Sequence, residues 1–204
     1  MLIIGLTGSL GMGKSTVAKH LRMRGIPVID ADAIVHQLYE GAAVPEIEAA
    51  FPGTTASGKV DRGKLGAELI ASPDRFAELE AIVHPLVRAE ERIFLQTEND
   101  RGTPIVALEI PLLFETGGHE LVDYTIVVSA PHEIQRQRVL ARGGISAEKL
   151  EKLLERQMPD AEKRARADFI VETGGELEHS HAQLDAILAQ LKGRKGKAYE
   201  RWWA

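Results

Sequence analysis

An eight-residue phosphate-binding motif near the N-terminus constrains this chain more than any other feature of its sequence. It runs from Gly8 to Ser15, reads GSLGMGKS, and matches the pattern G-x-x-x-x-G-K-[ST]. Glycines allow the backbone to wrap closely around phosphate oxygens, and the next helix adds free N–H groups at its start. The lysine of such a loop reaches the β- and γ-phosphates, and the hydroxyl of its last residue can ligate Mg²⁺. We therefore expect ATP to be bound by Gly11, Met12, Gly13, Lys14, Ser15 and Thr16, with Ser15 as the metal ligand.

The residues on either side place this loop between a buried strand and a helix. Leu2 to Leu6 form a continuous apolar run that is typical of a strand in a parallel sheet, and a helical stretch runs from Lys14 to Arg24. Further strands are predicted at 26–29, 105–108, 125–128 and 168–171. Helical stretches alternate with these strands, so the sequence predicts an α/β fold with a parallel sheet.

The middle of the chain is predicted to be almost entirely helical, which suggests an insertion into the α/β core. Helices are expected at 33–39, 44–51, 62–70, 74–83 and 85–97, with a loop at 53–58. Pro85 should open the last of these helices, because the first helical turn needs no N–H from that residue. Later helices are expected at 135–142 and 147–157, separated by Gly143-Gly144, and an amphipathic helix covers 177–191. The segment 192–204 is interpreted as a partly ordered basic tail, and packing of Trp202 and Trp203 on the body of the protein or against a partner is left open.

Composition excludes several classes of protein. The chain has 204 residues, enough for one domain, and no cysteine, which excludes thiolate catalysis and Cys-based zinc sites. Its net charge of −5 argues against a nucleic-acid-binding surface. We find no secretory signal and no apolar run long enough for a membrane span, so a cytoplasmic location and no membrane partner are expected.

The phosphate-binding motif alone does not separate kinases from other nucleotide-binding proteins. Guanine-specific switches use an Asn-Lys-x-Asp element, whereas the sole asparagine here, Asn99, precedes Asp100. Motor ATPases need an acidic residue after a strand, and Glu109 after 105–108 keeps a weak form of that reading open. The sequence favours a kinase that phosphorylates the hydroxyl of a small metabolite.

Two carboxylates at the end of the second predicted strand are candidates for the acceptor side. Asp30 and Asp32 lie where the carboxyl ends of strands line the ligand crevice of an open α/β sheet. A carboxylate there can orient or take the proton of an acceptor hydroxyl. Aspartate is also favoured as a helix N-cap, so one Asp can cap the next helix while the other acts.

Several elements, in this order, resemble the dephospho-CoA kinase family. They span residues 1 to about 175 and are GLTG at 5–8, VIDAD at 28–32, IVHPL at 82–86, IPLLFE at 110–115, Gln135, Arg138 and Arg142, RQM at 156–158, and ADF at 167–169. The resemblance implies an adenylate-kinase-like, three-layer P-loop fold with a five-stranded parallel sheet. It also implies phosphorylation of the 3′-hydroxyl of dephospho-CoA by Mg-ATP. On this basis we expect a core at about 1–40, 101–131 and 159–192, an acceptor-binding insertion at about 41–100, a lid at about 132–158, and a tail at 193–204.

The resemblance also assigns roles to single residues. Asp32 matches the family's catalytic base, which leaves Asp30 a structural part. Lys14, Arg138 and Arg142 are expected to offset charge on the transferring phosphoryl group, the two arginines from one helix face of the lid. Contacts with the acceptor are expected from His84, Leu112 and Leu113. From the residues alone, a buried His84 capping a helix and a solvated Glu115 remain alternatives.

One departure from the family concerns the end of the last strand. The family often has Asn-x-Gly near the adenine of ATP, whereas this chain has Thr173 in the sequence ETGG at 172–175. Threonine has no amide, so the resemblance does not extend to adenine contacts at this spot. A nucleoside or nucleotide kinase and an ATP-dependent regulatory protein stay as alternatives. We expect a monomer, with a homo-oligomer left open.

Overall fold

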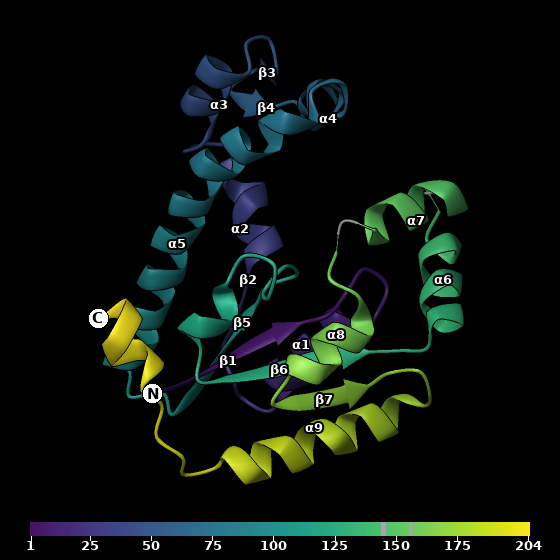
Figure 1. Cartoon of the computed structure of the whole chain (residues 1–204). Helices are drawn as coiled ribbons and strands as arrows, with labels where there is room; N and C mark the ends of the chain where they lie inside the picture. Colours follow the sequence, from purple (N-terminus) through teal and green to yellow (C-terminus); the bar gives the residue numbers. More distant parts are fainter. Residues whose placement is uncertain (144–145, 156) are drawn as a thin grey trace. The chain divides into compact units, whose positions relative to one another are not determined.

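The computed structural model describes residues 1–143, 146–155 and 157–204 (Figure 1). Gly144, of the glycine pair expected between the helices at 135–142 and 147–157, and Arg156 of the RQM element lie outside these residues. The chain divides into two compact units, which we describe separately. The first combines Met1–Ile29 with Leu95–Ala204, and the second is Asp30–Phe94.

A five-stranded parallel sheet forms the centre of the first unit and confirms the predicted fold class. Its strands are β1 (Leu2–Thr7), β2 (Val28–Asp30), β5 (Ile105–Glu109), β6 (Tyr124–Ser129) and β7 (Phe169–Glu172). They lie in the order β2-β5-β1-β6-β7. In the registers with β5 and β6, Leu6 lies opposite Glu109 and Ile126. Three strand ends therefore meet beside the phosphate loop that follows β1, and every residue of this central strand is buried.

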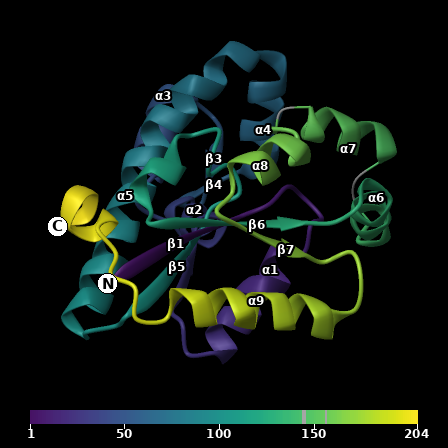
Figure 2. The same ribbon diagram turned by 60° about the horizontal axis from the view of Figure 1, so that its bottom comes forward.

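Helices pack on both faces of this sheet. The first unit contains α1 (Lys14–Met23), α6 (His132–Ala141), α7 (Ala147–Leu154), α8 (Asp160–Arg166) and α9 (Leu177–Leu191). Figure 2 shows α1 and α9 on one face and α8 on the other. Ile4 of β1 and Leu184 and Leu191 of α9 belong to the hydrophobic core of this unit. The helix predicted at 147–157 ends earlier, at Leu154. The sequence does not predict α8, because a helix of seven mostly charged residues is too short to show a periodic apolar face.

The second unit is helical, with one small exception. It contains α2 (Ala31–Leu38), α3 (Val44–Ala50), α4 (Arg62–Ala71), the 3₁₀ turn η1 (Pro73–Arg75) and most of α5 (Phe76–Asp100). The prediction of a loop at 53–58 is wrong in part, because β3 (Thr55–Ala56) and β4 (Lys59–Val60) pair as a hairpin. Ser57 and Gly58, both at positive φ, form its turn.

The prediction that Pro85 opens a helix is also wrong. Pro85 lies inside α5, one continuous helix of 25 residues where two were expected. An internal proline removes one backbone hydrogen bond and clashes with the preceding turn, a cost of about 3 kcal/mol. The strong helix formers on both sides and the buried face of α5, which includes Leu79, Val83 and Leu95, offset that cost.

The basic tail packs against other segments of the first unit. Its last turn, η3 (Tyr199–Trp203), buries Trp203 to 4% exposure, and the indole Nε1 donates to the carbonyl of Leu121 at 2.8 Å. The backbone N–H groups of Lys197 and Ala198 donate to Oδ1 of Asp123 at 2.6 and 2.9 Å. The other oxygen of Asp123 accepts from the N–H of Ile3 at 2.8 Å, so one carboxylate joins the tail to β1.

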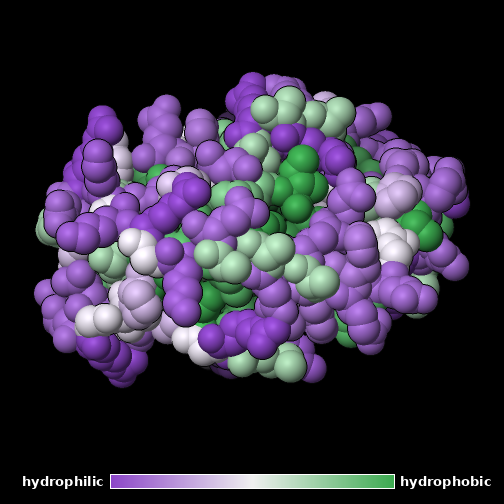
Figure 3. Space-filling view, turned by 90° about the horizontal axis from the view of Figure 1, so that it is seen from below, coloured by the Kyte–Doolittle hydropathy of each residue, from purple (hydrophilic) through white to green (hydrophobic). Residues whose placement is uncertain are grey.

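The surface is mostly hydrophilic on the face shown in Figure 3. Polar and charged groups predominate there, and apolar side chains show in smaller areas between them. Among the helices in the described part of the chain, none combines the length and apolar character that a membrane span requires.

Candidate functional site

The phosphate loop has the geometry that its glycines predict. Gly11 and Gly13 adopt φ values of 80° and 91°, a region that other residues rarely enter. A Cβ on Gly11 would lie 2.6 Å from the side chain of Val139, so space as well as conformation requires glycine. Gly13 precedes α1, and in the described structure no side chain caps the start of that helix. The N-terminus of α1 is thus available to an anion.

Lys14 and Ser15 both begin α1, beside a buried acid. Nζ of Lys14 lies 3.6 Å from Oε1 of Glu109, whose side chain is 3% exposed at the end of β5. Ser15 and Thr16 are exposed on the first turn. Hydroxyl and carboxylate oxygens are the donors that Mg²⁺ prefers, so the oxygens of Ser15 and Glu109 suit this ion together with phosphate oxygens.

Two glutamines hold the peptide groups of Leu10, inside the phosphate loop. Nε2 of Gln135, in the first turn of α6, donates to the carbonyl of Leu10 at 2.7 Å. The N–H of Leu10 donates to Oε1 of Gln157 at 3.4 Å. The two glutamines lie near opposite ends of the predicted lid. Their contact with the loop was missed because 125 and 147 residues separate the partners.

Thr173 ties the end of β7 to the phosphate loop. Its hydroxyl, in a residue 6% exposed, donates to the carbonyl of Met12 at 2.5 Å and lies 3.3 Å from the carbonyl of Ser129. The guanidinium of Arg138 reaches the same residue, with its NH1 group 3.2 Å from the hydroxyl and its NH2 group on the carbonyl oxygen. Thr173, which departs from the family pattern, therefore stabilises the phosphate loop through a hydrogen bond to its backbone. Arg142 ends α6 as its exposed C-cap.

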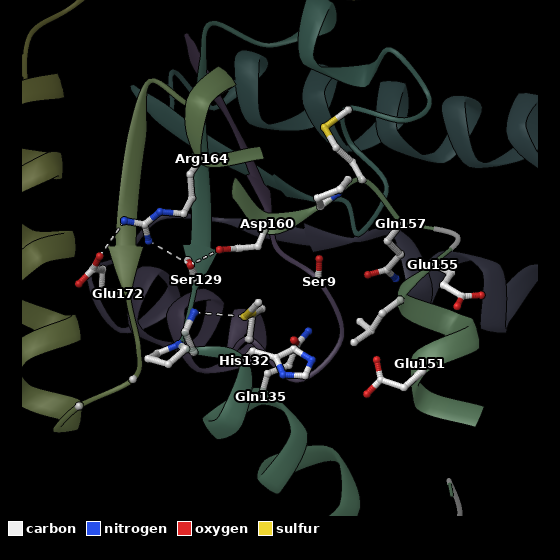
Figure 4. Close-up of a pocket in the computed structure, with 18 of the residues that line it drawn as sticks. Ser9, Ser129, His132, Gln135, Glu151, Glu155, Gln157, Asp160, Arg164 and Glu172 are labelled. Atoms are coloured by element: carbon white, nitrogen blue, oxygen red, sulfur yellow. Dashed lines mark hydrogen bonds and ion pairs between the residues drawn. The ribbon is translucent and has the colours of Figure 1, made fainter. Parts of the chain in front are cut away.

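A pocket of about 760 Å³ opens beside the loop (Figure 4). Ser129 at the end of β6 donates to Oδ2 of Asp160 at 2.7 Å and accepts from Arg164 at 3.1 Å. Arg164 also donates to Glu172 at 2.9 Å, so a network of charges joins α8 to the ends of β6 and β7. Met12 lines the same pocket, which places the loop in its wall. A cavity of this size and mixed polarity suits a small-molecule ligand.

The turn at 111–115 has a different structure from the expected pocket wall. Leu113 is fully buried, and a Cβ on Gly5 would lie 2.8 Å from it, so its side chain fills the core beneath the turn. This corrects the expectation that Leu113 contacts an acceptor, whereas Leu112 is half-buried. The alternative of a solvated Glu115 is also wrong for its side chain, which is only 18% exposed and lies 2.9 Å from Nζ of Lys163.

Two predicted site residues lie in the second unit. Asp30 is the N-cap of α2 and its Oδ1 accepts from the N–H groups of Asp32 and Ala33, at 2.9 and 3.4 Å. This capping is the structural part expected for Asp30, and it places Asp32, exposed, in the first turn of α2. His84 is exposed within α5, so the alternative of a buried cap at a helix start is wrong.

Comparison with known proteins agrees with this geometry over nearly the whole chain. The family model described as dephospho-CoA kinase matches residues 2–179. A dephospho-CoA kinase of Mesorhizobium japonicum is 54% identical over 196 residues, which are 96% of this chain and 100% of the relative. A crystal structure from Thermus thermophilus matches with a TM-score of 0.82 at 42% identity, covering 94% of this chain and 98% of that one. For dephospho-CoA kinase from Campylobacter jejuni the TM-score is 0.69 at 25% identity, with 93% and 96% covered. The phosphate loop, its sheet and these matches lead to one conclusion: the chain belongs to the dephospho-CoA kinase family.

Proposed function

We propose that this chain transfers the γ-phosphate of ATP to the 3′-hydroxyl of dephospho-CoA, which gives coenzyme A and ADP. The observation that carries the proposal is a complete phosphate loop, with Gly11 and Gly13 at positive φ, in a chain that matches the dephospho-CoA kinase family along 2–179. Phosphoryl transfer asks a protein mainly to position its reactants and to stabilise charge. The residues assigned below are given those two tasks.

The ATP side is assigned to the start of α1. The segment from Gly11 to Thr16 binds the phosphates, and the ammonium of Lys14 leaves Glu109 for the β- and γ-phosphates. The ion pair with Glu109 keeps Lys14 close to the site before ATP arrives. Mg²⁺, held by Ser15 and phosphate oxygens with Glu109 nearby, would neutralise charge on the transferring group.

Binding of the acceptor, dephospho-CoA, is assigned to the insertion expected at 41–100. Asp32, which also lies in the second unit, is assigned the role of base. As an exposed carboxylate in the first turn of α2, Asp32 can accept the proton of the ribose hydroxyl as it attacks phosphorus. His84 and Leu112 would contact the acceptor, and Leu113 would support the turn from the core.

The segment 132–158 is proposed as a lid that closes on ATP and excludes water. Arg138 would exchange its contact with Thr173 for the transferring phosphoryl group, and Arg142 would approach from the same helix face. We also propose a cytoplasmic monomer whose partners are ATP and dephospho-CoA.

The decisive experiment follows ADP release from Mg-ATP with and without dephospho-CoA, with mass detection of the product. We expect ADP release to depend on dephospho-CoA and the product to gain one phosphoryl group. ATP binding without stimulation by dephospho-CoA would contradict the proposal. A panel of nucleosides and nucleotides would then separate another small-molecule kinase from a regulatory ATP-binding protein.

A further inference from the structure

A fully buried lysine lies outside the phosphate loop and has none of the roles assigned above. The side chain of Lys163, on α8, is 0% exposed. Its Nζ lies 2.9 Å from Oε1 of Glu115 and 3.4 Å from the carbonyl oxygen of Pro111. Lysine is almost never fully buried unless it is paired. A buried ion pair is commonly no more stabilising than apolar side chains of the same volume, so stability alone does not account for this one.

Glu115 holds a second group with the same oxygen. Oε1 accepts a hydrogen bond from the backbone N–H of Met158 at 2.9 Å. Met158 lies at the returning end of the segment 132–158, two residues before α8 begins. Lys163 therefore fixes Glu115, and Glu115 fixes the main chain at the point where this segment rejoins the sheet and its helices.

The residue next to Met158 touches the phosphate loop. Oε1 of Gln157 accepts from the N–H of Leu10 at 3.4 Å, while Gln135 holds the carbonyl of Leu10 at 2.7 Å from the other end of the segment. Neighbouring Cα atoms are only about 3.8 Å apart, so a displacement of Met158 carries Gln157 with it. The contact at Leu10 thus depends on the contact at Glu115.

We propose that Lys163 and Glu115 are positioning residues for phosphoryl transfer. They hold the returning end of the segment 132–158 so that Gln157 supports the phosphate loop at Leu10. The inference rests on the proposed kinase activity, because its main readout is the KM for ATP in that reaction. A shift of a binding group by about 1 Å can cost on the order of 100-fold in rate, so even a small support of this kind affects catalysis.

The test removes both charges at once, since a single replacement would leave a buried charge unpaired. The variant is K163M/E115A, which also removes the acceptor of the Met158 N–H. The matched control is R166M/E162A, which deletes an exposed ion pair on the same helix. We expect K163M/E115A to raise the KM for ATP at least fivefold and to leave the KM for dephospho-CoA within twofold. The control should change neither constant, and partial unfolding would lower kcat without changing either.

A double-mutant cycle with Q157L then tests the route. Q157L alone should raise the KM for ATP, and adding it to K163M/E115A should raise that KM no more than twofold further. Three results would overturn the proposal: an unchanged KM for ATP, an increase confined to the KM for dephospho-CoA, or effects of K163M/E115A and Q157L that multiply.

The wild-type protein provides a second measurement if K163M/E115A does not fold. Amide hydrogen exchange followed by NMR should show protection of both the Leu10 and the Met158 N–H groups, and exchange of either at the unprotected rate contradicts the proposal. A wild-type chain that does not phosphorylate dephospho-CoA refutes the proposed function instead. The exchange measurement needs no substrate, so the two failures are distinguishable.

Discussion

At the scale of single residues, Asp30 and Asp32 are identical side chains at the start of α2 with different surroundings. The carboxylate of Asp30 accepts from the N–H groups of α2, which leaves it little freedom to take a proton. Asp32 follows it on the first helical turn and is exposed. The pair therefore offers a variant and its control at neighbouring positions.

We expect Asp32→Asn to lower kcat by about 100-fold or more, because loss of a general base typically costs roughly 10²–10⁴ in rate. The Kd for ATP, measured by calorimetry, should stay within twofold. Asp30→Asn is the control, since asparagine caps helices as well as aspartate does. Normal turnover of Asp32→Asn would show that another group takes the proton.

Thr173 supports the phosphate loop through its hydroxyl, so Thr173→Val should weaken the loop at nearly constant volume. The carbonyl of Met12 would lose its donor, which should lower the free energy of unfolding by roughly 1–3 kcal/mol. We also expect a higher Kd for ATP. Thr173→Ser keeps the hydroxyl and should restore both values, and a Thr173→Val protein equal to wild type in urea denaturation and ATP binding would sink this account.

The sequence predicts the residues of the phosphate loop because their requirement is local. Gly11 and Gly13 carry their conformation in their own backbone, and Asp30 caps the helix that it precedes. Lys163 lies in no sequence motif, and its partner Glu115 is far along the chain. Gln157 belongs to the RQM element, but that element gives no sign of its contact with Leu10. The sequence does not show whether Leu113 lies in the core or in a pocket wall, because an apolar side chain suits both places equally well; in the structure it is fully buried.

At the scale of elements, α5 keeps a proline in its interior. The sequence predicts the five strands because each is a short apolar run. It predicts two helices in place of α5 because Pro85 suits the start of a helix. The packing of a long amphipathic helix outweighs propensity here. The short α8 and the β3–β4 hairpin contain too few residues to show a periodic pattern.

Replacing Pro85 by alanine should restore the missing backbone hydrogen bond of α5. We expect the free energy of unfolding to rise by roughly 1–3 kcal/mol in urea denaturation followed by circular dichroism. Pro73→Ala is the control, because Pro73 begins η1, where its N–H is not needed. A fall in stability for Pro85→Ala would mean that the proline shapes a bend on which packing depends.

Glu91, on the same helix, should make stability depend on pH. Burial raises its pKa from 4.5 to about 7, against the opposing effect of Arg88 at 3.3 Å. The folded state therefore holds this proton more tightly than the unfolded state does. Protonated Glu91 therefore stabilises the fold fully below about pH 4.5, and this stabilisation is lost as the pH rises through about 7. The free energy of unfolding should fall by on the order of 3 kcal/mol across this range. Urea denaturation at intervals of pH should show this fall, and Glu91→Gln should remove it; equal slopes for both proteins would exclude Glu91 as the cause.

At the scale of the whole molecule, the tail closes the first unit by joining its last residues to β1. Of the two alternatives for the tail, packing on the body is confirmed for Trp203. The glycines and lysines of the tail give no sign of the acceptor that binds their backbone. That acceptor, Asp123, lies 74 residues before Lys197. Gly196 approaches Met1 and Asp123 so closely that a Cβ would lie 2.3 Å from an oxygen of each.

We expect Trp203→Ala to lower the free energy of unfolding by about 3 kcal/mol, as for other buried aromatic side chains. Trp202→Ala, at a residue 40% exposed, is the matched control and should cost less than about 1 kcal/mol. Thermal unfolding of both variants measures the difference. Equal midpoints would mean that the tail is not docked in solution.

The tail also gives the protein its own optical probe. Both of its tryptophans, Trp202 and Trp203, are adjacent residues of this one segment. Intrinsic emission excited at the indole band therefore reports a single location, where the C-terminal turn contacts residues 121–123. If the emission stays constant during an ATP titration, this contact does not change when ATP binds. If the emission shifts, binding at the phosphate loop alters the structure at the opposite, N-terminal end of β1.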